Sequence, residues 1–230
     1  MTYLSRLLLN PRSRRVQREL ADPYEMHRTV MKAFATELQN DERILFRVDL
    51  PRAGAPSLLV QSQYEPDWND LLDPQKKYLA DAAYLPFGNN PVAVKEIDFE
   101  QKLQIGQQLA FRLRANPTVK KARFDQDGKP LNGNRVPLVR EEKQLEWLKR
   151  KITDKNTARL LAATITTEND LRGKLFTEKD NQKRMKFHAV QFEGILQIEN
   201  KDEFLNVLEN GIGPGKGLGF GLLSLAPSRG

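Results

Sequence analysis

The order of the first predicted elements constrains the fold of this chain more than any other feature. Residues 2–9 (TYLSRLLL) are typical of a buried strand, and helix-start signals predict a helix from Pro23 to about Gln39. Residues 43–50 and 58–64 alternate well enough to form two strands, which a turn rich in proline and glycine would join. Strand, helix, strand, strand is the first part of a ferredoxin-like βαββαβ unit, so the sequence predicts an α+β fold.

The length of 230 residues fits one large domain or two domains of about 100 residues each. The segment PFGNNP at residues 86–91 is typical of a connector. We therefore expect a domain boundary near residue 92, which divides the chain into residues 1–92 and 93–230.

The predicted helix of the first half carries the residues with the clearest chemical potential. Asp22 is a suitable N-cap, a proline occupies the first helical position, and Glu25 follows the cap by three residues, as in a capping box. At about 100° per residue, Tyr24 and His27 lie about 60° apart, and Lys32 lies about 80° to the other side of Tyr24. One helix face can thus present a phenol, an imidazole and an ammonium near a helix N-terminus that favours anions. This set suits proton transfer beside a phosphate.

A structural interpretation of the same helix stays open at this point. Met26, Val30, Phe34 and Leu38 form an apolar stripe, and His27 lies near its edge. A single histidine in such a place is more often a structural or surface residue than a catalyst.

The composition limits the classes of function. The net charge of +7 and the pI of about 9.5 favour a polyanionic partner. The chain has no cysteine, which excludes disulfides, thiolate metal ligands and thiol nucleophiles and fits a cytoplasmic location. With two histidines, a His-rich metal site is not expected, and the carrier of a proton at neutral pH is His27 or His188. No apolar run approaches the roughly 18 residues of a membrane span, and the N-terminus lacks the features of a secretory signal.

Basic side chains recur along the chain as candidate phosphate contacts. Residues 107–116 predict a strand with Leu109, Phe111 and Leu113 on one face and Arg112 and Arg114 on the other. Such a guanidinium-bearing face suits a nucleic-acid backbone, although an ordinary solvent-exposed strand has the same pattern. The other basic candidates for such contacts are Arg12, Arg14, Arg15, Arg18, Arg28, Lys120, Lys121 and Lys216.

The second half shows clear elements around one ambiguous stretch. A hairpin is expected with turns at Asp127-Gly128 and Asn132-Gly133. The elements expected after it are a helix over 141–151, a strand over 187–199, a short helix over 202–208 and a final strand over 222–225. His188 alternates in phase with the apolar positions of its strand and is interpreted as a packing residue. The pattern over 156–176 fits neither helix nor strand clearly.

A glycine-rich segment, GIGPGKGLGFG, precedes the final strand. It lacks the spacing and the Ser or Thr of a Walker A loop, and no G-x-G-x-x-G register fits it, so no nucleotide cofactor is expected. Backbone without Cβ atoms can approach a ligand or another element closely, and both alternatives stay open. The glycines in question are Gly211, Gly213, Gly215, Gly217 and Gly219.

This segment resembles the signature of the RAMP superfamily of CRISPR-associated proteins. Its continuation through LLSLAP, the opening TYLSRLLLNP and the helix PYEMHRTVMKAF together resemble the CasE family, the CRISPR-repeat endoribonucleases of the type I-E Cascade complex. FRLRANP at 111–117 and AVQFEG at 189–194 are similar to strands of that family in the same order.

The resemblance implies two tandem ferredoxin-like (RRM-like) domains with RNA bound across them. It implies metal-independent cleavage of precursor CRISPR RNA at the base of the repeat hairpin, by attack of a 2′-hydroxyl that leaves 2′,3′-cyclic phosphate and 5′-hydroxyl ends. It places the catalytic roles on His27, Tyr24 and Lys32, with no cofactor. The implied partners are the repeat hairpin, the mature crRNA and other Cascade subunits.

Two other functions remain to be distinguished from this one. A non-catalytic RNA-binding subunit of a CRISPR ribonucleoprotein would use the same fold and basic surfaces. An enzyme acting on an anionic metabolite or a nucleotide would depend on the glycine-rich segment, and its register argues against that alternative.

Overall fold

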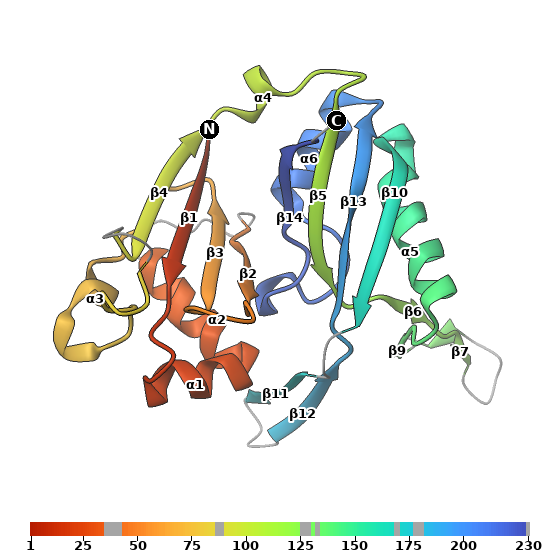
Figure 1. The fold of residues 1–230 in the computed structure, drawn as a ribbon. Helices are drawn as coiled ribbons and strands as arrows, with labels where there is room; N and C mark the ends of the chain where they lie inside the picture. Colours follow the sequence, from red (N-terminus) through yellow and green to blue (C-terminus); the bar gives the residue numbers. More distant parts are fainter. Residues whose placement is uncertain are drawn as a thin grey trace.

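Two four-stranded antiparallel sheets form the body of the protein in a computed structural model (Figure 1). The structure describes residues 1–34, 43–85, 90–124, 130–131, 134–167, 171–176 and 182–228. None of the helices within these ranges is long and apolar enough to cross a membrane.

The first sheet has the strand order β2-β3-β1-β4, and every neighbouring pair in it is antiparallel. Its strands are β1 (Thr2–Leu8), β2 (Leu45–Asp49), β3 (Ser57–Ser62) and β4 (Val92–Ile97). The three strands expected in residues 2–64 are therefore confirmed. β4 begins where we expected a domain boundary, yet it pairs with β1, with Leu7 opposite Val92. The first sheet thus continues to Ile97.

Helices cover one face of the first sheet. α1 (Arg14–Ala21) and α2 (Pro23–Met31) lie against this face, and the short helices of this half are η1 (Lys32–Phe34), α3 (Asn69–Leu72) and η2 (Pro74–Lys76). Val16 of α1 and Met26 and Val30 of α2 pack with Leu7 and Phe46 in the core of this half. The expected end of the long helix near Gln39 lies outside the described residues.

The second sheet has the order β10-β13-β5-β14, again with antiparallel neighbours. Its strands are β5 (Gln108–Ala115), β10 (Ala158–Thr167), β13 (Val190–Ile198) and β14 (Leu223–Pro227). When the four strands of each sheet are numbered in chain order, both sheets have the same arrangement of second, third, first and fourth strand. The ambiguous stretch 156–176 contains β10, which has a register shift between Leu160 and Ala162.

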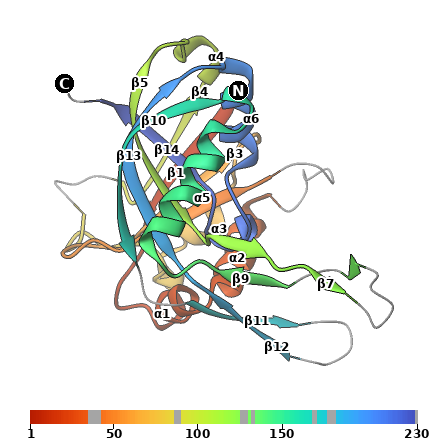
Figure 2. The same cartoon turned by 90° about the vertical axis from the view of Figure 1, so that its right-hand side faces the viewer.

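Helices α5 (Glu141–Thr153) and α6 (Lys201–Asn210) cover one face of the second sheet (Figure 2). Trp147 of α5 stacks on Phe192 of β13 with ring centroids 6.1 Å apart. Phe204 of α6 is fully buried in the same cluster. The smaller helices of this half are α4 (Phe99–Lys102), η4 (Asp154–Asn156) and η5 (Lys216–Leu218).

Three two-stranded ribbons complete the second half. β6 (Thr118–Lys120) pairs with β9 (Arg135–Pro137), β7 (Arg123–Phe124) with β8 (Pro130–Leu131), and β11 (Leu171–Phe176) with β12 (Gln182–Phe187). The first two pairings fit the expected hairpin, whose glycine turns lie outside the described residues. The ribbon β11–β12 lies below the second sheet in Figure 1 and contacts α1 and α2.

Arg47 joins the two sheets at their neighbouring edges, β2 and β14. Its side chain is 3% exposed and makes a bidentate ion pair with Asp49, at 2.8 and 3.0 Å. The same guanidinium donates to Ser224 Oγ at 2.8 Å and to the carbonyl of Arg112 at 3.3 Å. One buried side chain of the first sheet therefore fixes the position of the second.

Candidate active site

A single residue connects α1 to α2 and caps both. The backbone N–H of Asp22 donates to the carbonyl of Arg18 at the end of α1, and its carboxylate accepts the N–H of Tyr24 at 3.0 Å. The expected N-cap is confirmed, but the reciprocal bond of a capping box is not formed. Because the N–H of Asp22 is already used by α1, Glu25 instead pairs with Arg28 at 3.4 Å.

Tyr24 and His27 lie together on the first turns of α2, with ring centroids 6.3 Å apart. A Cβ atom added at Gly217 would lie 3.5 Å from His27 Cε1 and 3.6 Å from Nδ1, so the glycine-rich backbone faces the imidazole at close range. Removal of water by these neighbours lowers the pKa of His27 below its ordinary value. A neutral imidazole that can accept a proton is therefore the prevailing form near pH 7.

Lys32 lies on another side of the same helix. At 100° per residue it is about 140° from His27 around the helix axis. The pKa of Asp70 is lowered mainly by a hydrogen bond from Lys76, and the charge of Lys32 contributes further, so Lys32 is near α3. Lys32 has no hydrogen bond or ion pair with any residue that the structure describes. The ammonium thus remains exposed and is not in contact with the imidazole.

The glycine-rich segment packs closely against the rest of the protein. The N–H of Gly221 donates to the carbonyl of Arg114 at 2.8 Å, and its carbonyl accepts the N–H of Ile212 at 2.9 Å. Cβ atoms at Gly211, Gly213, Gly215 and Gly219 would meet Leu45, Trp147, Phe220 and Phe46, respectively, within 3.1 Å. Four of the five candidate glycines therefore serve close packing, and the fifth, Gly217, faces the histidine.

The two arginines of β5 have different environments. Arg112 is 44% exposed and pairs with Glu193 of β13 at 2.7 Å and more distantly with Asp49. Arg114 is only 7% exposed, and its guanidinium lies 5.4 Å from the centre of the Phe220 ring. The expectation that both arginines lie on an exposed face is wrong for Arg114, because the glycine-rich segment covers that part of the sheet.

The sequence of this chain matches the family described as CRISPR associated protein over residues 2–227. The chain belongs to this family. It is 37% identical to the CRISPR-associated endoribonuclease Cse3 of Thermus thermophilus over 235 residues, which cover 98% of this chain and all of the relative. The expected membership of the CasE family is thereby confirmed.

A second relative and a solved structure of Thermus thermophilus Cse3 support the assignment. The Cascade subunit CasE of Escherichia coli is 39% identical over 140 residues, which cover 59% of this chain and 65% of that protein. The structure of Thermus thermophilus Cse3 bound to an RNA representing a pre-cleavage complex superimposes with a TM-score of 0.71. That structure is 35% identical, and the match covers 98% of this chain and 99% of that one.

The other basic residues that the sequence predicted as phosphate contacts differ in how far they are buried. Arg15 is engaged, since it pairs with the buried Glu19 at 2.8 Å. Lys216 is half-buried, and burial, followed by the charges of Arg43 and Lys151, lowers its pKa. The residues that remain exposed are Arg12, Arg14, Arg18, Arg28, Lys120 and Lys121; of these, Arg28 pairs with Glu25, and the Arg12 guanidinium lies 5.4 Å from the centre of the Tyr84 ring.

Two cavities on either side of η5 differ in their charge. One has a volume of about 620 Å³ and is lined by six cationic and two acidic side chains. The cations are Lys120, Arg135, Arg150, Lys151, Lys155 and Lys216, and the acids are Asp154 and Glu203. The other is a groove of about 1060 Å³ between the sheets, and it is lined by three cationic and three acidic side chains. The first cavity is therefore the more favourable surface for phosphates.

Sequence reasoning missed four of the cations in this basic cavity. Arg135, Arg150, Lys151 and Lys155 come from β9, α5 and η4, and each occurs in a locally ordinary polar segment. No local pattern distinguishes them, because it is the packing of these elements that brings them together. Within the described ranges, no group of three or more histidine, aspartate or glutamate side chains converges as metal ligands would.

Proposed function

We propose that this chain is a CRISPR-repeat endoribonuclease that binds the repeat hairpin and cleaves precursor CRISPR RNA at its base. The observation that carries the proposal is His27, half-buried with a lowered pKa, beside Tyr24 and facing Gly217. The proposal is supported by the names of the relatives, one an endoribonuclease and another a Cascade subunit.

The chemistry needs few groups, because the nucleophile belongs to the substrate. The 2′-hydroxyl upstream of the scissile phosphate attacks the phosphorus, and the 5′-oxygen leaves, giving 2′,3′-cyclic phosphate and 5′-hydroxyl ends. Such a reaction requires proton removal, protonation of the leaving group and stabilisation of charge, so we propose that it proceeds without a metal ion. The neutral imidazole of His27 is suited to proton transfer.

Tyr24 and Lys32 have supporting roles in this proposal. Tyr24 lies beside His27 and would orient the 2′-hydroxyl or take part in the proton transfer. Lys32, on another side of α2, would act on the phosphorane charge and not on the imidazole. The free ammonium of Lys32 is consistent with a role that only bound RNA completes.

Hairpin RNA is read mainly through its shape, its phosphates and its 2′-hydroxyls. The exposed arginines of α1 and the basic cavity beside Lys216 supply phosphate contacts in this proposal. After cleavage the protein would stay bound to the crRNA as a subunit of Cascade, in the cytoplasm where the precursor is made.

We also propose that the chain consists of two tandem ferredoxin-like domains. The shared strand order of the two sheets and the helices between their strands support this division. Because β4 pairs with β1, the change of domain is better placed between Ile97 and Gln108 than near residue 92.

A single-turnover assay on a labelled repeat hairpin in excess EDTA tests the reaction. A parallel substrate carries a 2′-deoxy sugar upstream of the expected cut. We expect cleavage of the ribose substrate to a cyclic-phosphate end, with the deoxy substrate bound but intact. Tight binding of a matching hairpin with neither substrate cut would instead indicate a non-catalytic RNA-binding subunit.

The two histidines of the chain provide a matched pair of variants. His27→Ala should lower the cleavage rate by at least about 10²-fold, as expected for loss of a general acid or base, while hairpin affinity is retained. His188→Ala serves as the control, because His188 lies between β12 and β13 beside Gln144. Retained cleavage by His27→Ala would move the catalytic role to another residue.

A further inference from the structure

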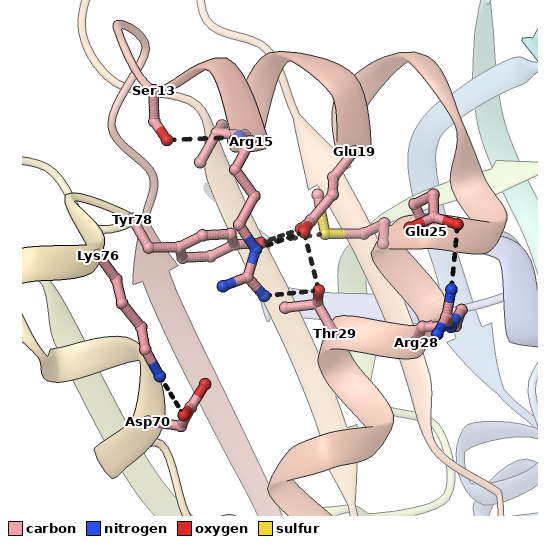
Figure 3. Close-up of polar contacts among 11 residues, drawn as sticks. Ser13, Arg15, Glu19, Glu25, Arg28, Thr29, Asp70, Lys76 and Tyr78 are labelled. Carbon is pink, nitrogen blue, oxygen red and sulfur yellow. Dashed lines mark hydrogen bonds and ion pairs between the residues drawn. The ribbon is translucent and has the colours of Figure 1, made fainter.

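A buried carboxylate in the first half is not used by the proposed chemistry. Glu19 lies in the last turns of α1 and is 2% exposed. It accepts hydrogen bonds from Arg15 Nε at 2.8 Å, from Thr29 Oγ1 at 2.9 Å and from the Tyr78 hydroxyl at 2.6 Å (Figure 3). A buried charge is costly unless it is fully paired, and these three donors provide the pairing.

The donors also contact one another, which closes the network. Arg15 Nη2 donates to Thr29 Oγ1 at 3.1 Å, and the Arg15 guanidinium lies 4.8 Å from the centre of the Tyr78 ring. Burial first, and then the charge of Glu19, raise the pKa of Tyr78 far above its ordinary value. The phenol therefore stays protonated and donates to Glu19 throughout the range of neutral pH.

Each donor comes from a different part of the fold. Thr29 belongs to α2 and follows His27 by two residues. Tyr78 is fixed beyond the end of β1, since its carbonyl accepts the N–H of Asn10 at 2.9 Å. Glu19 thus connects the helix that carries His27 both to α1 and to the first sheet.

The backbone that faces His27 is held by the second sheet. Gly217 belongs to the glycine-rich segment, which is bound to β5 of the second sheet through Gly221 and Arg114. The place of His27 beside Gly217 therefore depends on where α2 lies, and the Glu19 hydrogen bonds join α2 to α1 and to Tyr78.

We propose that Glu19, with Arg15 and Tyr78, is a positioning unit that holds the imidazole of His27 against Gly217. The inference rests on the proposed function for its effect on cleavage. Misplacement of a reacting group by about 1 Å can reduce a rate by about 10²-fold, so a network that fixes one helix has a measurable catalytic effect.

The test uses Glu19→Gln and Tyr78→Phe in the full-length protein. For Glu19→Gln we expect the single-turnover rate at saturating protein to fall about 10- to 100-fold. The hairpin Kd should change less than about twofold, because Glu19 is buried. Tyr78→Phe removes one donor and keeps the ion pair, so its rate should fall by a smaller factor.

Proton NMR of the histidine rings provides a readout without RNA. The chain has two histidines, and His27→Ala assigns their signals. We expect Glu19→Gln and Tyr78→Phe to shift the ring signal and the titration midpoint of His27, and to leave His188 unchanged. If the wild type does not cleave RNA, the proposed function fails, and this readout still decides on the positioning unit.

Ser5→Ala is the matched control. It removes another buried hydrogen bond of the same core, from Trp68 Nε1 at 3.0 Å, and touches neither α1 nor the Glu19 network. We expect its rate and its His27 signal to match those of the wild type. The proposal is overturned if Tyr78→Phe leaves both the rate and the His27 signal unchanged, or if Ser5→Ala alters them equally. Should Glu19→Gln fail to fold, Tyr78→Phe alone decides.

Discussion

The properties of individual residues in this protein depend on what covers them. His27 is half-buried against the backbone of Gly217, and Lys32, five positions later, is exposed. Arg112 and Arg114 are two positions apart on one strand, yet one is 44% exposed and the other is 7% exposed. The chemistry of each side chain therefore follows from neighbours that are distant in sequence.

The depressed pKa of His27 predicts its titration. Because desolvation disfavours the imidazolium, the NMR midpoint of the free protein should lie below 6.5, the ordinary value for histidine. The pKa of His27 is lower in the folded protein than in the unfolded chain, so the unfolded chain binds the proton more tightly. His27 therefore lowers the free energy of unfolding as the pH falls below about 6.5. His27→Ala should remove this contribution in urea unfolding at pH 5 relative to pH 7. A midpoint at or above 6.5 would contradict the prediction.

The two arginines of β5 predict different outcomes on truncation. Arg114→Ala should lower the free energy of unfolding by about 1–2 kcal/mol, because a desolvated contact with Phe220 is lost. Arg112→Ala should lower the free energy of unfolding by less than about 1 kcal/mol, since the ion pair between Arg112 and Glu193 is exposed to solvent. Urea unfolding measures both. Equal losses would show that burial does not distinguish the two positions.

The role of Arg112 in RNA binding is measured separately. If it contacts phosphate, Arg112→Ala weakens hairpin binding and lowers the salt dependence of log Kd by about 0.7–0.9 for the one contact removed. Affinity that is unchanged across a salt series would assign Arg112 to the interaction with Glu193 alone.

At the scale of elements, the glycine-rich segment combines two requirements. Most of its glycines allow the backbone to pack closely on the two sheets, and Gly217 faces the imidazole of His27. η5, which contains Gly217, also separates the basic cavity from the groove between the sheets. The segment is therefore both a structural connection and one wall of the candidate site.

Gly219 and Gly217 form a matched pair for alanine substitution. Gly219 has a φ of +82°, so Gly219→Ala should cost about 1–2 kcal/mol of stability from the left-handed backbone alone. Gly217→Ala makes an ordinary contact of 3.5 Å with His27 and should change stability by less than about 0.5 kcal/mol. We expect it to lower the cleavage rate by covering the imidazole. Thermal unfolding and single-turnover rates separate the two effects, and a large loss of stability in Gly217→Ala would contradict this assignment.

At the scale of the whole molecule, the relation between the sheets depends on buried polar contacts. Arg47 connects β2 to β14 and β5, and Gln61 of β3 donates to the carbonyl of Leu208 in α6 at 2.6 Å. His27 is on an element of the first half and Gly217 on an element of the second. The candidate site exists only when the two halves are held together.

Arg47→Met should therefore destabilise the whole protein. The substitution leaves Asp49 without its bidentate partner. We expect the free energy of unfolding to fall by about 3 kcal/mol, which is at the low end for a broken buried ion pair because the Asp49 side chain is 23% exposed. Arg159→Met is the control, since its ion pair with Glu199 is exposed and should cost less than about 1 kcal/mol. Urea unfolding gives both values. Equal stability of the two variants would show that Arg47 does not connect the sheets energetically.

Local patterns in the sequence predicted much of the secondary structure correctly. An apolar run located β1, alternation located β2, β3 and β5, and the Asp22 cap and the proline after it located the start of α2. These features depend on neighbours a few residues apart, which the sequence displays directly. The same spacing predicted that Tyr24 and His27 lie together, and the structure places their rings 6.3 Å apart.

Only the tertiary structure decided what those elements contact. Alternation placed Arg114 on one face of β5 but carried no information on the segment that covers this face. The place of His27 beside Gly217 and the hydrogen bond from Tyr78 to Glu19 bring together residues far apart in the chain. β4 and β10 were not recognised: β4 directly follows the segment interpreted as a connector, and a register shift between Leu160 and Ala162 interrupts the alternation of β10. Sequence thus determined the helix that carries the candidate site residues Tyr24 and His27, and long-range packing determined its surroundings.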